Sequence, residues 1–290
     1  MRVLILGGTG MLGHNLLKRL QIRFPDVWAT VRCHSTSVQG LGIPREGLIQ
    51  DVDVTDFTRL NQVLDANSPD VIVNAIAVTK RREGEKGDPA AIAEVIRVNS
   101  ELPHRLAAWA SPRKARVIHF STDCVFDGKR GGYTESDLPN ADDLYGRSKA
   151  LGEIGEAEGR CLTLRSSLIG RELRGHTELL EWFLSQSGKR VKGFRQAVFS
   201  GLASWVMSDL VGELIESHPD LVGMYQVASE PINKYELLCL TREAFGLPME
   251  IVPDDGFVCR RNLDGSRFRR LTGWSAPSWP EMLKGIADGN

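Results

Sequence analysis

The sequence predicts an α/β fold in which a doubly wound parallel sheet is joined to a smaller C-terminal lobe. Three observations predict this fold class. Over the first 170 residues, short apolar runs rich in Val and Ile alternate with longer stretches of helical spacing, as in successive βα units. A glycine-rich turn joins the first apolar run to the first helical stretch. The chain of 290 residues is also long enough to bury a large core.

The expected elements follow one another along the first part of the chain. Strands are predicted at 3–6, 27–31, 48–52, 71–77, 117–121 and 161–166, and helices at 11–20, 57–66, 90–109 and 145–158. Strands that are apolar on both faces are expected to lie centrally, with helices covering both sides of the sheet.

The pattern loosens after residue 170, where several prolines interrupt the chain. Helices are predicted at 178–186, 205–217 and 234–245, with a basic turn at 189–192. No linker rich in Gly, Ser or Pro separates the two parts. We therefore expect a dinucleotide-binding domain at 1–170 and, interleaved with it, a smaller substrate-binding lobe at 171–290.

Composition and charge exclude several classes of protein. With 36 basic and 37 acidic side chains, the net charge of −1 provides no field for nucleic acid or an anionic membrane. The five cysteines form no C-x-x-C pair, and the six histidines show no metal-ligand spacing, so we expect reduced thiols and no metal site. No apolar run resembles a signal segment or reaches the ~18 residues of a membrane helix, so a cytoplasmic protein is expected.

The glycine turn has the context of a dinucleotide-binding motif. It follows the first predicted strand, opens the first predicted helix and reads Gly7-Gly8-Thr9-Gly10-Met11-Leu12-Gly13. Glycines allow the backbone to approach a pyrophosphate, whose charge meets the unpaired N–H groups at the start of a helix. This arrangement predicts a Rossmann-type site for a nicotinamide dinucleotide.

The end of the second predicted strand indicates which dinucleotide is bound. An Asp or Glu that would accept hydrogen bonds from the ribose hydroxyls of NADH is missing there, and Arg32 follows instead. A guanidinium suits a 2′-phosphate, so we expect NADPH rather than NADH.

Tyr145 and Lys149 have the spacing of neighbours on one helix face. A cation near a phenol favours the phenolate, so we expect Lys149 to lower the pKa of Tyr145 toward the working range. Thr122 follows the fifth predicted strand, at the edge where parallel sheets bind ligands. Together these residues suggest that Thr122 hydrogen-bonds a substrate carbonyl, Tyr145 delivers a proton and the cofactor delivers hydride.

These motifs resemble the extended short-chain dehydrogenase/reductase superfamily and, within it, the dTDP-4-dehydrorhamnose reductase family. Beyond the glycine turn, the resemblance rests on segments that span almost the whole chain, at 53–56, 74–77, 98–99, 121–128, 164–167 and 278–280, with Tyr145 and Lys149.

The resemblance implies an NADPH-dependent reduction of the 4-keto group of a 4-keto-6-deoxy nucleotide sugar, for surface polysaccharide. It implies a catalytic set of Thr122, Tyr145 and Lys149, with Lys149 also on the nicotinamide ribose. The smaller lobe would close over the sugar nucleotide, and a homodimer is a further expectation. The other implied contacts are Asp53, Val54, Ala75, Ala77 and Asn99 for the cofactor, and Cys124, Val125, Phe126, Lys192 and Arg195 for the substrate.

Two departures from the family pattern leave alternatives open. Cys124 replaces the family's usual tyrosine, and 78–82 is basic where a family variant is acidic. Thr-Asp-Cys in place of Thr-Asp-Glu disfavours a 4,6-dehydratase. A cysteine at this position is similar to that of GDP-fucose synthases, so Cys124, assisted by His176, would make the protein a 3,5-epimerase and 4-reductase. A non-catalytic NADP-binding subunit, like the regulatory subunit of methionine adenosyltransferase, is the other alternative.

Overall fold

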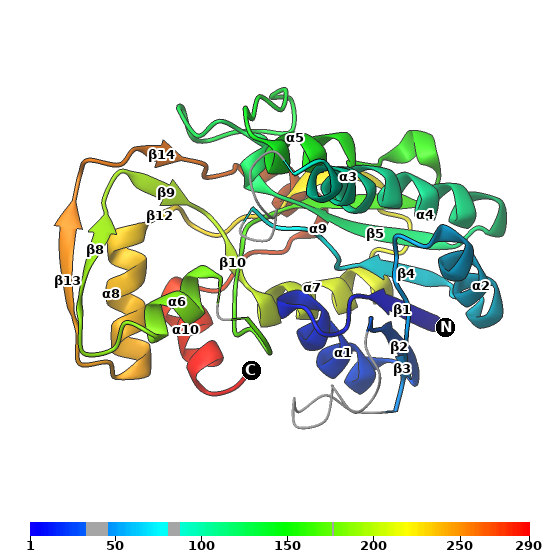
Figure 1. The fold of residues 1–290 in the computed structure, drawn as a ribbon, viewed down its shortest axis with the longest axis horizontal. Helices are drawn as coiled ribbons and strands as arrows, with labels where there is room; N and C mark the ends of the chain where they lie inside the picture. Colours follow the sequence, from blue (N-terminus) through cyan, green and yellow to red (C-terminus); the bar gives the residue numbers. More distant parts are fainter. Residues whose placement is uncertain (33–45, 81–87, 176) are drawn as a thin grey trace.

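The computed structural model describes residues 1–32, 46–80, 88–175 and 177–290. A seven-stranded parallel sheet forms the centre of the molecule (Figure 1). Its strand order is β11-β6-β5-β4-β1-β2-β3, and every neighbouring pair is parallel. The predicted doubly wound fold is therefore confirmed. The strands are β1 (Arg2–Leu6), β2 (Asp26–Thr30), β3 (Leu48–Ile49), β4 (Val71–Asn74), β5 (Arg116–Ser121), β6 (Cys161–Arg165) and β11 (Gly223–Gln226).

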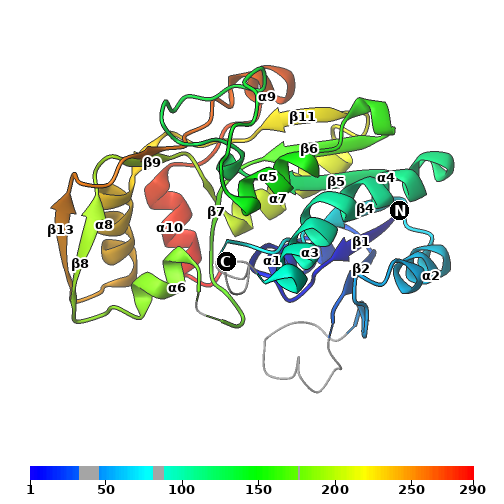
Figure 2. The ribbon, with the colours of Figure 1, turned by 45° about the horizontal axis from the view of Figure 1, so that its top comes forward.

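Helices cover both faces of this sheet, as Figures 1 and 2 show. In β1, Val3 and Ile5 pack in one apolar cluster, and Leu4 and Leu6 pack in another. This alternation is what a strand buried on both faces requires. One face carries α1 (Met11–Arg23) and α7 (Ser204–Glu216); the other carries α2 (Phe57–Asn67), α3 (Pro89–Ile96), α4 (Leu102–Ala110) and α5 (Leu144–Leu151).

Two predicted helices are interrupted in the structure. The helix expected at 90–109 is divided by a π-helix at Arg97–Glu101 between α3 and α4. Pro103 has no N–H to donate to the Asn99 carbonyl, which favours this local widening. The helix expected at 145–158 ends with α5 at Leu151, and only a short 3₁₀ turn forms at Glu156–Glu158. Gly152 is the C-cap, and a Cβ there would meet the Asn99 carbonyl oxygen.

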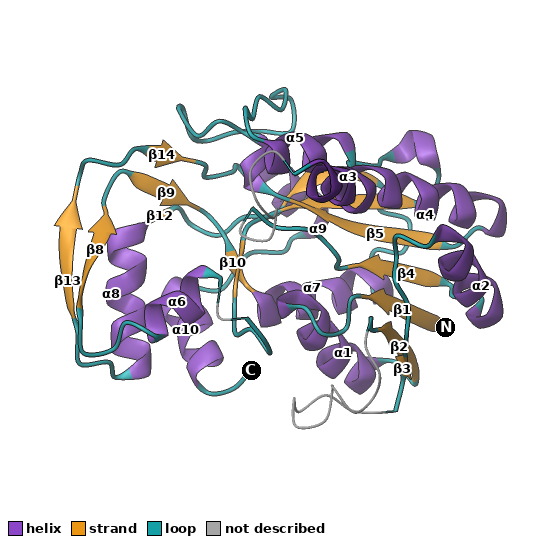
Figure 3. Cartoon of the chain, viewed as in Figure 1, coloured by secondary structure: helices purple, strands orange, loops and turns teal. Residues whose placement is uncertain are grey.

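The C-terminal part of the chain forms a lobe beside the sheet (Figure 3). It also supplies the edge strand β11 of the sheet and the helix α7, which packs beside α1. The helix predicted at 234–245 is α8 (Lys234–Phe245). The basic turn predicted at 189–192 is wrong, because Lys192 lies within strand β8, whose alternating exposure marks a half-buried strand. The other elements of this part are α6 (Leu179–Leu184), α9 (Ser266–Thr272), α10 (Trp279–Ala287), β7 (Leu168–Ile169), β8 (Arg190–Phe194), β9 (Ala197–Phe199), β10 (Leu202–Ala203), β12 (Ile232–Asn233), β13 (Glu250–Asp254) and β14 (Cys259–Arg260).

Within the described ranges, no helix has the length and apolar character needed to cross a membrane.

Candidate functional site

A cavity of about 240 Å³ opens at the carboxyl ends of the central strands, beside the glycine turn. Gly7 has φ +92°, a conformation that side chains rarely adopt. A Cβ on Gly13 would lie 1.9 Å from the Gly7 carbonyl oxygen, so α1 can approach the turn only with glycine there. The cavity is lined by Gly7, Thr9, Gly10, Thr30, Val31, Arg32, Val52, Asp53, Val54, Thr55, Ala75, Ile76, Ala77, Val78, Glu94 and Val98.

Most residues predicted to contact the cofactor lie around this cavity. Gly7, Gly10, Arg32, Asp53, Val54, Ala75 and Ala77 all line it. Met11, Leu12, Gly13, Asn99 and Lys149 are not among its lining residues. The Leu12 side chain packs in the apolar core, so only the backbone of Leu12 is left to contact a cofactor.

Arg32 lies at the rim of the cavity among carboxylates. Its guanidinium is 3.9 Å from Glu94, and its side chain is 69% exposed. Burial of Asp53 raises the pKa of its carboxyl, but hydrogen bonds from Thr55 and the charge of Arg32 outweigh this and leave the pKa lowered. An anion bound near Arg32 would therefore compete with these carboxylates for the guanidinium.

Asn99 holds the cavity wall in place. Its side-chain oxygen accepts a hydrogen bond from Val78 N at 2.9 Å, and its amide donates to Val78 O at 2.9 Å and Ser148 Oγ at 3.1 Å. The side chain is fully buried, with its donors and acceptor used within the protein. Asn99 thus links the wall at Val78 to α5, the helix that carries Tyr145 and Lys149.

Thr122 and Tyr145 lie near each other just beyond β5, close enough for the Thr122 side chain to influence the pKa of Tyr145. The Thr122 hydroxyl donates to Asp123 Oδ1 at 3.1 Å. Thr122 caps a short 3₁₀ helix at Asp123–Val125 by accepting from Cys124 N at 3.1 Å. A Cβ on Gly146 would lie 2.2 Å from the Cys124 carbonyl oxygen, so glycine lets α5 approach this segment closely. The sequence-predicted pair is therefore brought together by the approach of α5.

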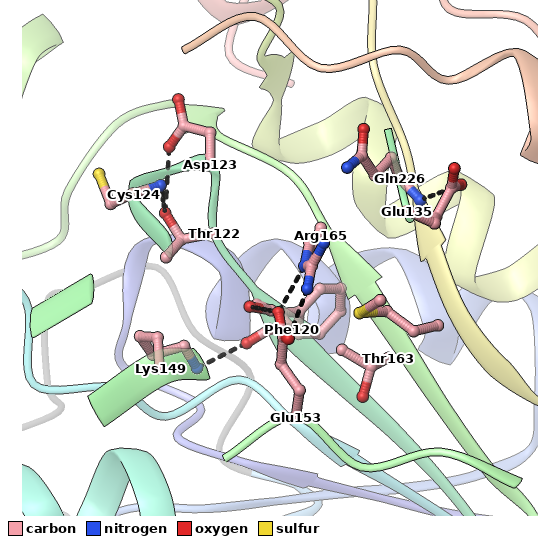
Figure 4. A network of polar contacts seen from close by, with 12 residues as sticks. Phe120, Thr122, Asp123, Cys124, Glu135, Lys149, Glu153, Thr163, Arg165 and Gln226 are labelled. Carbon is pink, nitrogen blue, oxygen red and sulfur yellow. Dashed lines mark hydrogen bonds and ion pairs between the residues drawn. The ribbon is translucent and has the colours of Figure 1, made fainter. Parts of the chain in front are cut away.

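Lys149 is turned toward the interior. Its side chain is 2% exposed, and Nζ donates to the Phe120 carbonyl at 2.6 Å, as Figure 4 shows. Burial lowers the pKa of Lys149 to about 8, although the charge of Glu153 acts in the opposite direction.

The pKa of Tyr145 is raised, not lowered as expected from its spacing to Lys149. Burial is the main cause, and the neighbouring Cys124, Asp123 and Glu178 act in the same direction. The Thr122 side chain acts in the opposite direction on the pKa of Tyr145 without reversing the shift. Helical spacing placed the two residues one turn apart, but the direction of the lysine side chain depends on its contacts with β5.

Cys124 lies beside this pair with its thiol held in the protonated form. Burial and the charge of Asp123 raise the pKa of the thiol to about 12. Arg261 Nη1 is 3.5 Å from the sulfur, and its attraction only partly offsets these effects. His176, the predicted assistant of Cys124, lies outside the described residues.

Four predicted substrate contacts are placed away from any described cavity. The side chains of Val125 and Phe126 are fully buried, and Phe126 stacks on Tyr133 at 4.1 Å, so only their backbone is left to meet a substrate and their contact with it stays a prediction. Lys192 pairs with Asp254 at 2.9 Å, and Arg195 pairs with Asp255. These two cations have carboxylate partners on exposed segments of the lobe, and their contact with a diphosphate stays a prediction.

Arg261 is the cation that the sequence analysis missed. It follows β14 in the lobe, and its Nε donates to the Phe126 carbonyl at 2.9 Å. The charges of Asp123 and Asp143 also act on it, so it faces the segment that carries Thr122. The one signal in the sequence is a pair of adjacent arginines, Arg260 and Arg261, among many other cations of the lobe.

No group of three or more His, Cys, Asp or Glu side chains in the described ranges is arranged to hold a metal ion.

Comparisons with known proteins identify relatives of this chain. The family model described as the RmlD substrate binding domain matches residues 1–184. A dTDP-4-keto-6-deoxy-D-glucose reductase from Streptomyces niveus is 35% identical over 153 residues, covering 52% of this chain and 46% of that protein. The methionine adenosyltransferase 2 subunit beta of Mus musculus is 29% identical over 266 residues, covering 85% of this chain and 73% of that protein.

The fold is shared with solved structures. The dTDP-4-dehydrorhamnose reductase of Bacillus anthracis, solved in complex with NADP, superimposes with a TM-score of 0.80 at 21% identity, covering 100% of this chain and 99% of that one.

Proposed function

This chain belongs to the RmlD substrate binding domain family, and we propose that it reduces the 4-keto group of a 4-keto-6-deoxy nucleotide sugar. The named relatives include oxidoreductases of the extended short-chain dehydrogenase/reductase type. The name of the Streptomyces relative supports this substrate class. Surface polysaccharide biosynthesis is the process we propose for the product.

A nicotinamide dinucleotide suits the residues around the cavity. Gly7 and Gly10 line it without side chains, and α1 begins at Met11 with no side chain capping its first N–H groups. A pyrophosphate is the kind of group that such a helix start accepts. When bound, the nicotinamide supplies hydride to the carbonyl carbon.

The residues beyond β5 supply the rest of the chemistry in this proposal. Thr122 Oγ1 hydrogen-bonds the carbonyl oxygen, and Tyr145 gives it a proton as negative charge develops there. The raised pKa of Tyr145 keeps the phenol protonated, which is the form needed for this donation. Lys149 has to turn from the Phe120 carbonyl if it is to meet the nicotinamide ribose.

We further propose NADPH as the preferred cofactor and Arg261 as the cation that faces the substrate. Arg32 lines the cavity where a 2′-phosphate would lie, and β2 ends without a carboxylate. Arg261 comes from the lobe, which supports the division into a cofactor domain at 1–170 and a substrate-binding lobe at 171–290.

The closeness of Thr122 and Tyr145 carries the proposal, since a protein that only binds a dinucleotide has no need of a phenol and a threonine together at this edge of the sheet. The test is oxidation of NADPH by the purified protein with dTDP-4-keto-6-deoxyglucose. Tyr145→Phe is expected to slow turnover about a hundredfold or more. Tyr235→Phe, in α8, is the matched control and should leave turnover unchanged. Equal turnover in both variants would refute the role of Tyr145.

A non-catalytic NADP-binding subunit is the second candidate. The subunit beta relative covers 85% of this chain, compared with 52% for the Streptomyces reductase. This function predicts cofactor binding, measured by fluorescence of the reduced nicotinamide, without oxidation by any 4-keto nucleotide sugar. The epimerase alternative is the weaker one, because the Cys124 thiol has its pKa raised to about 12.

A further inference from the structure

Behind Lys149, three buried polar side chains form a continuous chain across two strands and a helix. Asn74 ends β4, His119 lies opposite it on β5, and Lys149 reaches them from α5. His119 Nδ1 is 3.1 Å from Asn74 Nδ2, and His119 Nε2 is 3.4 Å from Lys149 Nζ. All three side chains are 2% exposed or less.

The direction of the hydrogen bonds along this chain is set at Asn74. The backbone N–H of Ile76 donates to Asn74 Oδ1 at 3.3 Å, which leaves the amide Nδ2 facing His119. An amide nitrogen only donates, so His119 Nδ1 must accept. A neutral imidazole then carries its proton on Nε2, the nitrogen that faces Lys149.

This tautomer discriminates between the two forms of Lys149. An ammonium has three donors and no acceptor, so it would meet the Nε2–H of His119 donor to donor. A neutral amine has a lone pair that accepts from Nε2–H, while one of its own N–H groups still donates to the Phe120 carbonyl at 2.6 Å.

The charged groups around the chain leave the imidazole neutral. Burial, Lys149 and His104 from α4 all lower the pKa of His119 well below its ordinary value. Glu153 favours the ammonium of Lys149, but its two oxygens already accept from Ser121 Oγ and from Nε and Nη2 of Arg165.

We propose that Asn74 and His119 are positioning residues that make the Lys149 ammonium lose its proton more easily than the ammonium of an ordinary lysine. Protonation of Lys149 then requires His119 to move its proton from Nε2 to Nδ1 and Asn74 to turn its amide. The catalytic meaning of this coupling rests on the proposed reductase function: where Lys149 has lost its proton, the smaller positive charge near Tyr145 favours the protonated phenol that donates. The hydrogen-bond chain itself does not depend on that function.

Asn74→Asp tests the proposal with a nearly isosteric change. A carboxylate accepts from Nδ1–H of His119, so the Nε2 lone pair would face Lys149 and favour the ammonium. The full chain is labelled with the NMR-active nitrogen isotope at lysine Nζ, and the Lys149 resonance is assigned by its loss in Lys149→Met. We expect the titration midpoint of Lys149 to rise by about one unit or more in Asn74→Asp. Asn67→Asp, where the same side chain donates to Val63 O on α2, is the control and should not move it.

Two results would overturn the proposal: an ordinary lysine midpoint for Lys149 in the unchanged protein, or the same midpoint in Asn74→Asp. If Asn74→Asp does not fold, the ring-nitrogen shifts of His119 in the unchanged protein decide instead, and a proton on Nδ1 refutes the inference. An expected titration combined with no turnover of any nucleotide sugar would refute the proposed function alone.

Discussion

Replacing Lys149 with methionine tests how much the buried ammonium costs the folded protein. Burial lowers the pKa of Lys149 from 10.5 to about 8. Below about pH 8 the lysine is protonated in both the folded and unfolded states, so the folded state bears the full cost of burial. Between about pH 8 and pH 10.5 the folded protein has lost this proton while the unfolded chain keeps it, so stability rises with pH.

The size of the pH-dependent change in stability follows from the lowering of the pKa of Lys149. The lowering from 10.5 to about 8 corresponds to about 3 kcal/mol of free energy of unfolding. Between about pH 7 and about pH 10, the unchanged protein should gain about 2–3 kcal/mol relative to Lys149→Met. Other titrating groups are common to both proteins, so they cancel in the difference.

The assay is urea unfolding of both proteins at several pH values, followed by circular dichroism. Lys284→Met, on the exposed face of α10, serves as the control and should show no such pH-dependent difference. A difference between the unchanged protein and Lys149→Met that stays constant across this range would refute the reasoning, because Lys149 would then titrate as it does in the unfolded chain.

Three further predictions concern the cofactor, the glycine turn and the thiol. Arg32→Ala should lower the ratio of kcat/KM for NADPH over NADH by about tenfold or more, the worth of a charged hydrogen bond; an unchanged protein that favours NADH would contradict this. Gly13→Ala should reduce the free energy of unfolding by about 1–3 kcal/mol or more, since its Cβ would lie 1.9 Å from the Gly7 carbonyl oxygen, whereas Gly155→Ala has open space and should be nearly neutral. Mass spectrometry of the product formed in heavy water should find no deuterium at C3 or C5, because the Cys124 thiol stays protonated; deuterium there would support epimerisation.

The sequence predicted the sheet and the glycine turn because both depend on neighbouring residues. Val3 and Ile5 face one core while Leu4 and Leu6 face the other, a period that the sequence shows directly. Helix ends were predicted less accurately: α5 ends at Leu151, whereas the sequence predicted a helix that continues to residue 158.

The candidate site was predicted only in part, because spacing along a helix does not fix the direction of a side chain. Thr122 and Tyr145 do meet, since Gly146 lets α5 approach the segment beyond β5. Lys149 instead turns to the Phe120 carbonyl and to His119, a histidine that looked like an ordinary strand residue in the sequence.

Local sequence is enough to specify the order of the βα units and the glycine turn at Gly7, since each depends on residues within a few positions of one another. The cation that lies against the segment after β5 is set by the packing of the lobe. Arg261 reaches the Cys124 sulfur from 137 residues away, while Lys192 is held by Asp254 across a pair of strands. Contacts between distant segments depend on how the lobe folds against the sheet, and no local pattern of residues encodes that geometry.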